Sequence, residues 1–404
     1  MTTMRSLLGR REAERPIGPP DSASIDIDAL ARRFSTEDRR EIRRLLRLSP
    51  RMVDLATIFP GALFAIVREE LAPDLRRHAM ELVLCGAQLK DIAHALNLPI
   101  WLRKLPPEAY SGPLPSLPQS EAFARRIVNC MPQTRSESAL WLKTVAFAAE
   151  AAHEDFAIWL ANQSLYSGEG DPRRMFAVLA AYAWYSSQPG KAATSLIMVP
   201  WRPEISLETS LCAAKSWLNR IRLSLQLQPG VIADGWLQPG EHKGLVFQPL
   251  LDAAQLLDEA QGMHNCADQF AERIARDRSR LWTVRRRNGQ RLATLEIAQH
   301  AREAGVLDIV QLKARHNLPA PLEVWQAAHA WMSAQDGLRR APPLMLPPRG
   351  LDGETWAAFM QPYRLHRQGA PWLPVNLTLA ALGTLDSDMT ELARRSGVSS
   401  WLFT

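Results

Sequence analysis

The chain has 404 residues, of which 47% are hydrophobic and 22% are charged, and its net charge is +6 at pH 7. These values exclude a disordered or fibrous chain and are typical of a globular protein with two or three domains. The mild positive charge permits contact with nucleic acid or an anionic surface, but it does not by itself indicate either.

The cysteines indicate the compartment in which the chain folds. They occur at positions 85, 130, 212 and 266, far apart and without a Cys-x-x-Cys pair. This spacing argues against a disulfide framework or a zinc knuckle and favours a reducing environment. The N-terminus lacks an apolar run of signal-peptide length, and no window of about 18 apolar residues occurs. We therefore expect a cytoplasmic protein without a membrane partner.

The N-terminal half is predicted to be helical. Residues 1–24 are polar and rich in proline, and we expect them to be disordered. Helical periodicity predicts an all-α domain over residues 25–190, including a long buried helix at 137–163. The segment DIAHALNLP (91–99) has the shape of the first half of a helix-turn-helix. A bundle helix is the favoured alternative, because no clear recognition helix follows.

The C-terminal half changes in character. Helices are expected at 206–225, 250–277 and 323–335, and three β-rich segments, RLWTVRRR, QRLATLEIAQ and LDIVQLKA, precede the last. Asn288-Gly289 between the first two predicts a hairpin. Residues 200–340 are thus predicted to form an α+β domain consisting of a helix, a three-stranded antiparallel sheet and a helix. A linker and a small helical tail (350–404) follow, so the fold class is mainly α with an α+β C-terminal half.

Residues 250–335 carry an ordered set of polar and small residues: Gly262, His264, Cys266, Arg285, Thr294, Glu296, Gln311, Asn317 and Pro319. In this order and spacing the segment resembles the PcfJ-like domain of bacterial chromosomes, plasmids and phages. The resemblance implies a bacterial module associated with mobile genetic elements, and it implies no particular reaction. Members commonly carry Gly where this chain has Ala314. If that Gly adopts a positive φ, Ala would strain the loop.

Side-chain direction predicts which of these residues can meet. On a regular helix His264 and Cys266 lie about 200° apart, so they cannot form a local pair, while Asp268 could orient His264 from one turn away. Strict alternation places Thr294 and Glu296 on one sheet face, opposite Leu295 and Ile297. In the third strand it places Val310 and Leu312 opposite Ile309, Gln311 and Lys313. Glu296 and Gln311 then share a face if the strands pair in the right register.

The candidate catalytic residues are therefore His264, Cys266, Glu296 and Gln311, which would supply a titrating base and a hydrogen-bond donor. Each has a structural alternative. Cys266 suits a buried thiol, His264 a polar network, Glu296 a solvated strand face, and Asn317 a turn. A zinc site lacks the required ligand spacing, and no other metal or cofactor is indicated.

Four arginines around the predicted hairpin are candidate phosphate ligands: Arg285, Arg286, Arg287 and Arg291. The alternative is an ordinary solvated hairpin tip. Three functions remain open: an enzyme acting on nucleic acid or a nucleotide, a non-catalytic module that binds nucleic acid or protein, and a helical structural adaptor.

Overall fold

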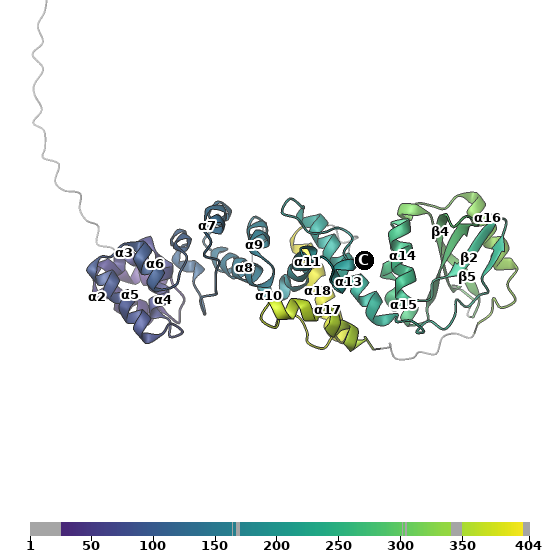
Figure 1. Ribbon diagram of the computed structural model, residues 1–404. Coiled ribbons are helices and arrows are strands. Elements are labelled where there is room, and N and C mark those ends of the chain that lie inside the picture. Colours follow the sequence, from purple (N-terminus) through teal and green to yellow (C-terminus); the bar gives the residue numbers. More distant parts are fainter. Residues whose placement is uncertain are drawn as a thin grey trace, which may run out of the picture. The chain divides into compact units, whose positions relative to one another are not determined.

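The computed structural model describes residues 26–163, 165–166, 170–300, 302–303, 305–340 and 350–398 (Figure 1). The predicted disordered segment 1–24 and most of the predicted linker lie outside these residues. The chain divides into two compact units, residues 1–114 and 115–404. The division falls inside the segment 25–190 that was predicted to be one all-α domain.

The first unit is helical throughout its described part. Its α-helices are α1 (Ile27–Arg32), α2 (Arg39–Leu48), α3 (Pro50–Ile58), α4 (Pro60–Val67), α5 (Pro73–Cys85) and α6 (Leu89–Ala95). Proline begins three of them, where its fixed φ suits the first turn and its missing N–H costs nothing. After α6 the chain forms a 3-10 helix, Ile100–Lys104, in place of the second helix that a helix-turn-helix requires.

The second unit begins with a helical region that also takes in the C-terminal helices. Its α-helices are α7 (Glu121–Ile127), α8 (Ser138–Ala151), α9 (Glu154–Ala161), α10 (Pro172–Met175), α11 (Ala177–Ser186), α12 (Ala192–Ser195), α13 (Leu207–Gln226), α17 (Gly353–His366) and α18 (Leu379–Arg395). The last two pack against α13, and the Tyr363 hydroxyl donates to the Ala151 carbonyl at 2.8 Å. The predicted tail is therefore part of the helical core.

The single helix predicted over 137–163 is wrong. The chain breaks between α8 and α9, and His153 caps the second helix by accepting a hydrogen bond from the Phe156 N–H at 3.2 Å. Most residues of both helices are buried, so the apolar sequence pattern runs across the break without interruption. The pattern therefore gave no sign that one helix ends and another begins.

The α+β part contains a five-stranded antiparallel sheet in the order β1 (Gly240–His242), β2 (Leu245–Pro249), β3 (Ser279–Arg286), β4 (Arg291–Gln299) and β5 (Leu307–Lys313). The mainly α fold with an α+β part is confirmed, but three strands were predicted where there are five. The missed pair is short and joined by Lys243-Gly244, both with positive φ, as in a two-residue hairpin turn. The hairpin at Asn288-Gly289 is confirmed.

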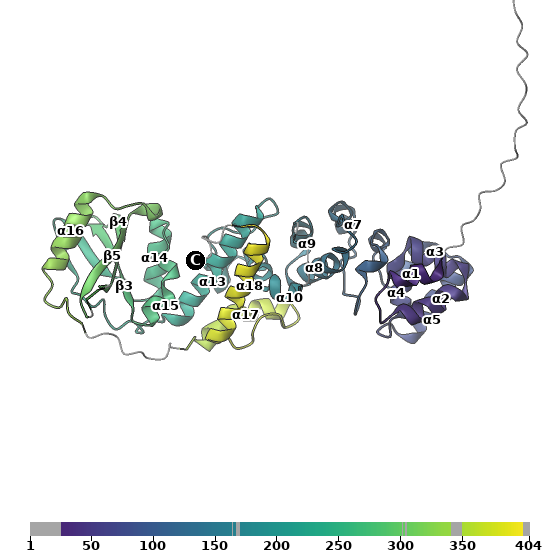
Figure 2. The same cartoon turned by 180° about the vertical axis from the view of Figure 1, so that it is seen from behind.

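Helices cover both faces of this sheet. Helices α14 (Ala253–Met263) and α15 (Ala271–Ala275) lie on one face, and α16 (Leu322–Ser333) lies on the other, as Figures 1 and 2 show from opposite sides. The α16 face holds the larger apolar core, in which Trp331 stacks on Phe247 with ring centroids 4.7 Å apart. The α14 face mixes apolar residues with the polar ones considered below.

A bulge in β5 breaks the alternation expected of that strand. Glu296 pairs with Gln311 and Ile297 with Ile309, so Val310 has no partner in the ladder. Ile309 and Leu312 both reach the α16 core, while Val310 is 50% exposed. The predicted grouping of Val310 with Leu312 is therefore wrong, because one extra residue reverses the faces on either side of it.

Deleting Val310 should leave the sheet intact. Without it, residues 307–313 alternate strictly, with Leu307, Ile309 and Leu312 toward α16 and Gln311 toward α14. We expect the free energy of unfolding to change by no more than about 1 kcal/mol, as for a surface change that buries no polar group.

Deleting Asp308 instead provides the control. That deletion turns Leu307 away from the core, and it should cost about 2–5 kcal/mol, as for loss of a core leucine. Thermal and urea unfolding of the two deletion variants would check this. Equal destabilisation by both would contradict the role assigned to the bulge.

Candidate functional site

The segment that carries His264 and Cys266 is a helix end. Helix α14 stops at Met263, and His264 takes a left-handed conformation with φ 49°. The Asn265 side chain then accepts a hydrogen bond from the Ala267 N–H at 3.1 Å, and a short 3-10 helix, η4 (Ala267–Gln269), follows. The continuous helix predicted over 250–277 is therefore wrong. The expectation that Asp268 lies one helical turn from His264 is wrong for the same reason.

A buried carboxylate joins α14 to the sheet. Glu259 is fully buried and accepts a hydrogen bond from the Thr294 hydroxyl at 2.7 Å. Thr294 in turn accepts one from the Asn265 amide, also at 2.7 Å. Arg291 donates to the other oxygen of Glu259 at 3.1 Å. This chain of bonds fixes the end of α14 on strand β4.

Gly262 is explained by the same arrangement. A Cβ atom at this position would lie 2.2 Å from Nη1 of Arg291, which crosses the helix there to reach Glu259 and Asp258. The small residue that precedes His264 thus allows the guanidinium to pass over the helix.

Three of the four candidate catalytic residues line one small cavity. Cys266, Glu296 and Gln311 surround a space of about 20 Å³, together with Thr294, Lys313 and other neighbours. Such a space holds about one water molecule. Gln311 donates to Glu296 at 2.8 Å, so the predicted shared sheet face of these two residues is confirmed. The Cys266 thiol points to the Asn317 side-chain oxygen at 3.6 Å.

His264 lies apart from this cavity. It is exposed, and its ring stacks on His316 with centroids 5.0 Å apart and planes 15° from parallel. Asp268, its predicted partner, is buried and pairs with Arg220 of α13 at 2.7 Å. The structure therefore brings Cys266, Glu296 and Gln311 together and leaves His264 beside a second histidine that was not singled out.

Burial dominates the electrostatics of the cavity. It raises the pKa of the Cys266 thiol, so that at neutral pH the thiol form is favoured over the nucleophilic thiolate. Burial also raises the pKa of Glu296, and the guanidinium of Arg273, 2.7 Å from its carboxylate, opposes that shift. Both shifts favour the uncharged form, as expected where little water enters.

The hairpin arginines divide into paired and free side chains. Arg291 pairs with Asp258 and Glu259, Arg287 pairs with Glu241 at 2.6 Å, and Arg285 lies 3.8 Å from Glu259. Arg286 is exposed and has no acidic partner among the described residues. Much of the predicted basic cluster is thus neutralised within the protein.

Ala314, the departure from the PcfJ-like pattern, is not strained. Its φ is −76° and its ψ is −175°, which is extended backbone open to any residue. The positive φ angles fall two and three residues later, at His316 and Asn317.

Sequence reasoning missed Glu259, Asn265, Lys313 and His316. A signal existed for Glu259, which lies three residues after Leu256 and one before Ala260, inside the apolar stripe of the helix. A carboxylate in such a stripe requires a buried partner. Asn265 and His316 had no comparable signal, because their roles depend on loop conformations.

Neither a metal centre nor a membrane span is found in the described ranges. No group of three or more His, Cys, Asp or Glu side chains there is arranged to hold a metal ion. No single helix in the same ranges is long and apolar enough to cross a membrane; the pair α3 and α4, bent by 118°, passes that test only when joined. No protein-family model, curated protein or solved structure matches the chain.

The raised pKa of Glu296 leads to a pH-dependent stability. The folded protein retains this proton to a higher pH than the unfolded chain does, so Glu296 lowers the free energy of unfolding as pH rises above its ordinary pKa of 4.5. Glu296→Gln keeps an acceptor for Gln311 and carries no charge. We expect wild type to lose stability relative to this variant between pH 4.5 and neutrality.

Hydrogen exchange of β4 amides across this pH range measures the effect locally. Glu323→Gln, at an exposed position of α16, is the control. A difference between wild type and Glu296→Gln that stays constant with pH, or that has the opposite sign, would contradict the assignment.

The thiol of Cys266 should react slowly. Because it is half-buried and its pKa is raised, we expect alkylation by iodoacetamide at neutral pH to be at least about tenfold slower than at exposed Cys85. Mass spectrometry of partly alkylated protein would compare the two sites in one sample. Labelling of Cys266 before Cys85 would indicate an activated nucleophile instead.

Proposed function

We propose that residues 240–333 form a PcfJ-like module that binds nucleic acid through contacts with phosphates. The supporting observation is an excess of cations at the end of the sheet that carries the β3–β4 hairpin. From β3 to the turn after β5 the cations at this end are Arg285, Arg286, Arg287, Arg291, Lys313 and Arg315, and the carboxylates that pair with them are Glu241, Asp258 and Glu259. Of these cations, Arg286, Lys313 and Arg315 have no acidic partner within the described residues.

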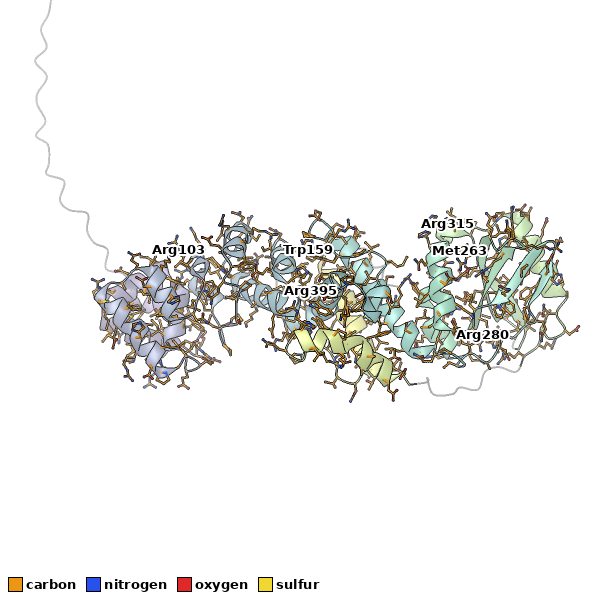
Figure 3. The ribbon with its side chains drawn as sticks, viewed as in Figure 1. Arg103, Trp159, Met263, Arg280, Arg315 and Arg395 are labelled. Atoms are coloured by element: carbon orange, nitrogen blue, oxygen red, sulfur yellow. The ribbon has the colours of Figure 1, made fainter. Side chains whose placement is uncertain are left out.

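These three side chains come from neighbouring elements. Arg286 ends β3 and Lys313 ends β5, two strands away, which corresponds to about 10 Å across the sheet. Lys313 is level with Thr283, three residues before Arg286, which adds about 10 Å along the strand, and the two side chains leave opposite faces of the sheet. Arg315 follows in a 3-10 turn, and Figure 3 places it with Met263 at one end of α14, away from Arg280. The backbone positions of Arg286 and Lys313 are thus about 14 Å apart, which covers about four phosphates along the axis of one strand.

The polar residues between α14 and the sheet support a binding role over a catalytic one. Glu259, Thr294 and Asn265 bond to one another, as do Glu296 and Gln311, around a cavity with room for about one water molecule. Side chains engaged in this way hold the helix on the sheet and position the cations around it.

Fluorescence anisotropy with labelled oligonucleotides at several salt concentrations would test the proposal. We expect measurable binding, and the logarithm of the affinity should fall linearly with the logarithm of the salt concentration. The triple variant Arg286→Gln/Lys313→Gln/Arg315→Gln should reduce the slope by about 2, since each phosphate contact contributes about 0.7 for a single strand.

A charge-matched triple variant serves as the control. Arg103→Gln/Lys104→Gln/Arg135→Gln removes two arginines and one lysine from exposed positions in the helical regions. It should leave the affinity and the salt slope close to wild type. The proposal fails if wild type does not bind, or if the two triple variants behave alike.

A further inference from the structure

A groove lies beside α14, where the helix leaves part of strand β2 uncovered. Its volume is about 440 Å³, within the range of small-ligand sites. Gln248 and Thr283 pair in the sheet and form its floor, since their neighbours Phe247 and Val284 face the opposite core. On the helix side Gln255 and Asp258 form a polar wall. One end of the groove is apolar and is lined by Pro239, Pro249, Leu250 and Leu251.

The groove presents hydrogen-bonding groups that the fold does not use. The amide of Gln248 is exposed and has no hydrogen-bond partner within the described part of the chain. Gln255 accepts a hydrogen bond from the Leu251 N–H at 2.8 Å through its oxygen, which leaves its amide nitrogen as a donor. A ligand in the groove can therefore bond to both the oxygen and the nitrogen of the Gln248 amide on the floor, and to the amide nitrogen of Gln255 on one wall.

One end of the groove is cationic. Arg285 donates through Nε to the Thr283 hydroxyl at 3.1 Å, and its Nη2 lies 3.8 Å from the buried carboxylate of Glu259. These contacts hold the guanidinium in place while leaving Nη1 for a ligand. Asp258, the acidic residue in the groove wall, is itself paired with Arg291.

We propose that this groove receives one unstacked base of a single-stranded nucleic acid, with an adjoining phosphate on Arg285. This inference rests on the nucleic-acid binding proposed above and specifies its substrate class. Glutamine amides pair with the hydrogen-bonding edge of a base, and aliphatic side chains such as Leu251 and Pro249 pack on its face. A base in a duplex is stacked and paired and cannot enter such a groove without being flipped out.

The nearness of the groove to other cations favours a polymer over a free small molecule. Arg285 is followed on β3 by Arg286, one of the three cations without an acidic partner within the described residues. Successive side chains of a strand leave opposite faces, so a nucleic-acid strand whose base lies in the groove reaches Arg286 by passing from Arg285 around the end of β3. A peptide could form the same hydrogen bonds with the two glutamine amides. Only an acidic peptide would also pair with the cations beyond the groove.

The Gln248→Leu variant tests this in the full-length chain. Leucine keeps the volume of the side chain and removes the amide. We expect the affinity for short single-stranded oligonucleotides to fall about tenfold, as for loss of one good side-chain-to-base pair, while duplex affinity stays the same. Gln361→Leu, an exposed position on α17, is the matched control and should change neither.

Photo-crosslinking of a thiouridine-containing oligonucleotide provides a second measurement that does not depend on a variant. Crosslinks should map to residues 248–258 and 283–285. Crosslinks confined to other parts of the chain, or a Gln248→Leu variant with an unchanged ratio of single-strand to duplex affinity, would overturn the groove assignment alone. Failure of wild type to bind any oligonucleotide would overturn the proposed function with it. Displacement of the oligonucleotide by an acidic peptide, without crosslinks in the groove, would point to a protein partner instead.

Discussion

The fully buried carboxylate of Glu259 is the constraint on which the α+β module depends. Removing a carboxylate from water costs several kcal/mol unless it is paired and hydrogen-bonded. Here Thr294 and Arg291 supply the compensation from β4, with Arg285 nearby on β3. These partners lie on two strands and the carboxylate lies on α14, so the helix must be docked for the charge to be tolerated. The interaction thus specifies one placement of α14 and requires a small residue at position 262.

The use of cations inside the protein decides what remains for ligands. Arg291 and Arg287 are committed to carboxylates, and Arg273 to Glu296. A cluster of basic residues in the sequence therefore overstates the positive surface, since internal pairing removes part of it. The cations that remain lie at strand ends and in the turn after β5, where no acidic side chain among the described residues reaches them. The proposed phosphate contacts depend on these side chains.

The three longer strands and the helices near 206–225 and 323–335 could be predicted because periodicity acts over many residues. The hairpin at Asn288-Gly289 and the shared face of Glu296 and Gln311 followed from that periodicity and from turn chemistry. What could not be predicted depends on the backbone of single residues. The bulge at Val310 and the helix end at His264 each alter side-chain direction locally, and neither changes the hydrophobic pattern around it. The two-residue turn between β1 and β2 was not predicted for the same reason.

Three non-glycine residues with positive φ angles lie at the end of α14 and in the turn after β5. His264, His316 and Asn317 are all left-handed, at a cost of about 1–2 kcal/mol for an ordinary residue and less for asparagine. Contacts across the two loops offset that cost, since His264 stacks on His316 and the Cys266 thiol points to Asn317. The fold therefore maintains a strained junction between the end of α14 and the turn after β5. Strain kept at one place by surrounding contacts is characteristic of binding surfaces, and this junction adjoins the cations of Lys313 and Arg315.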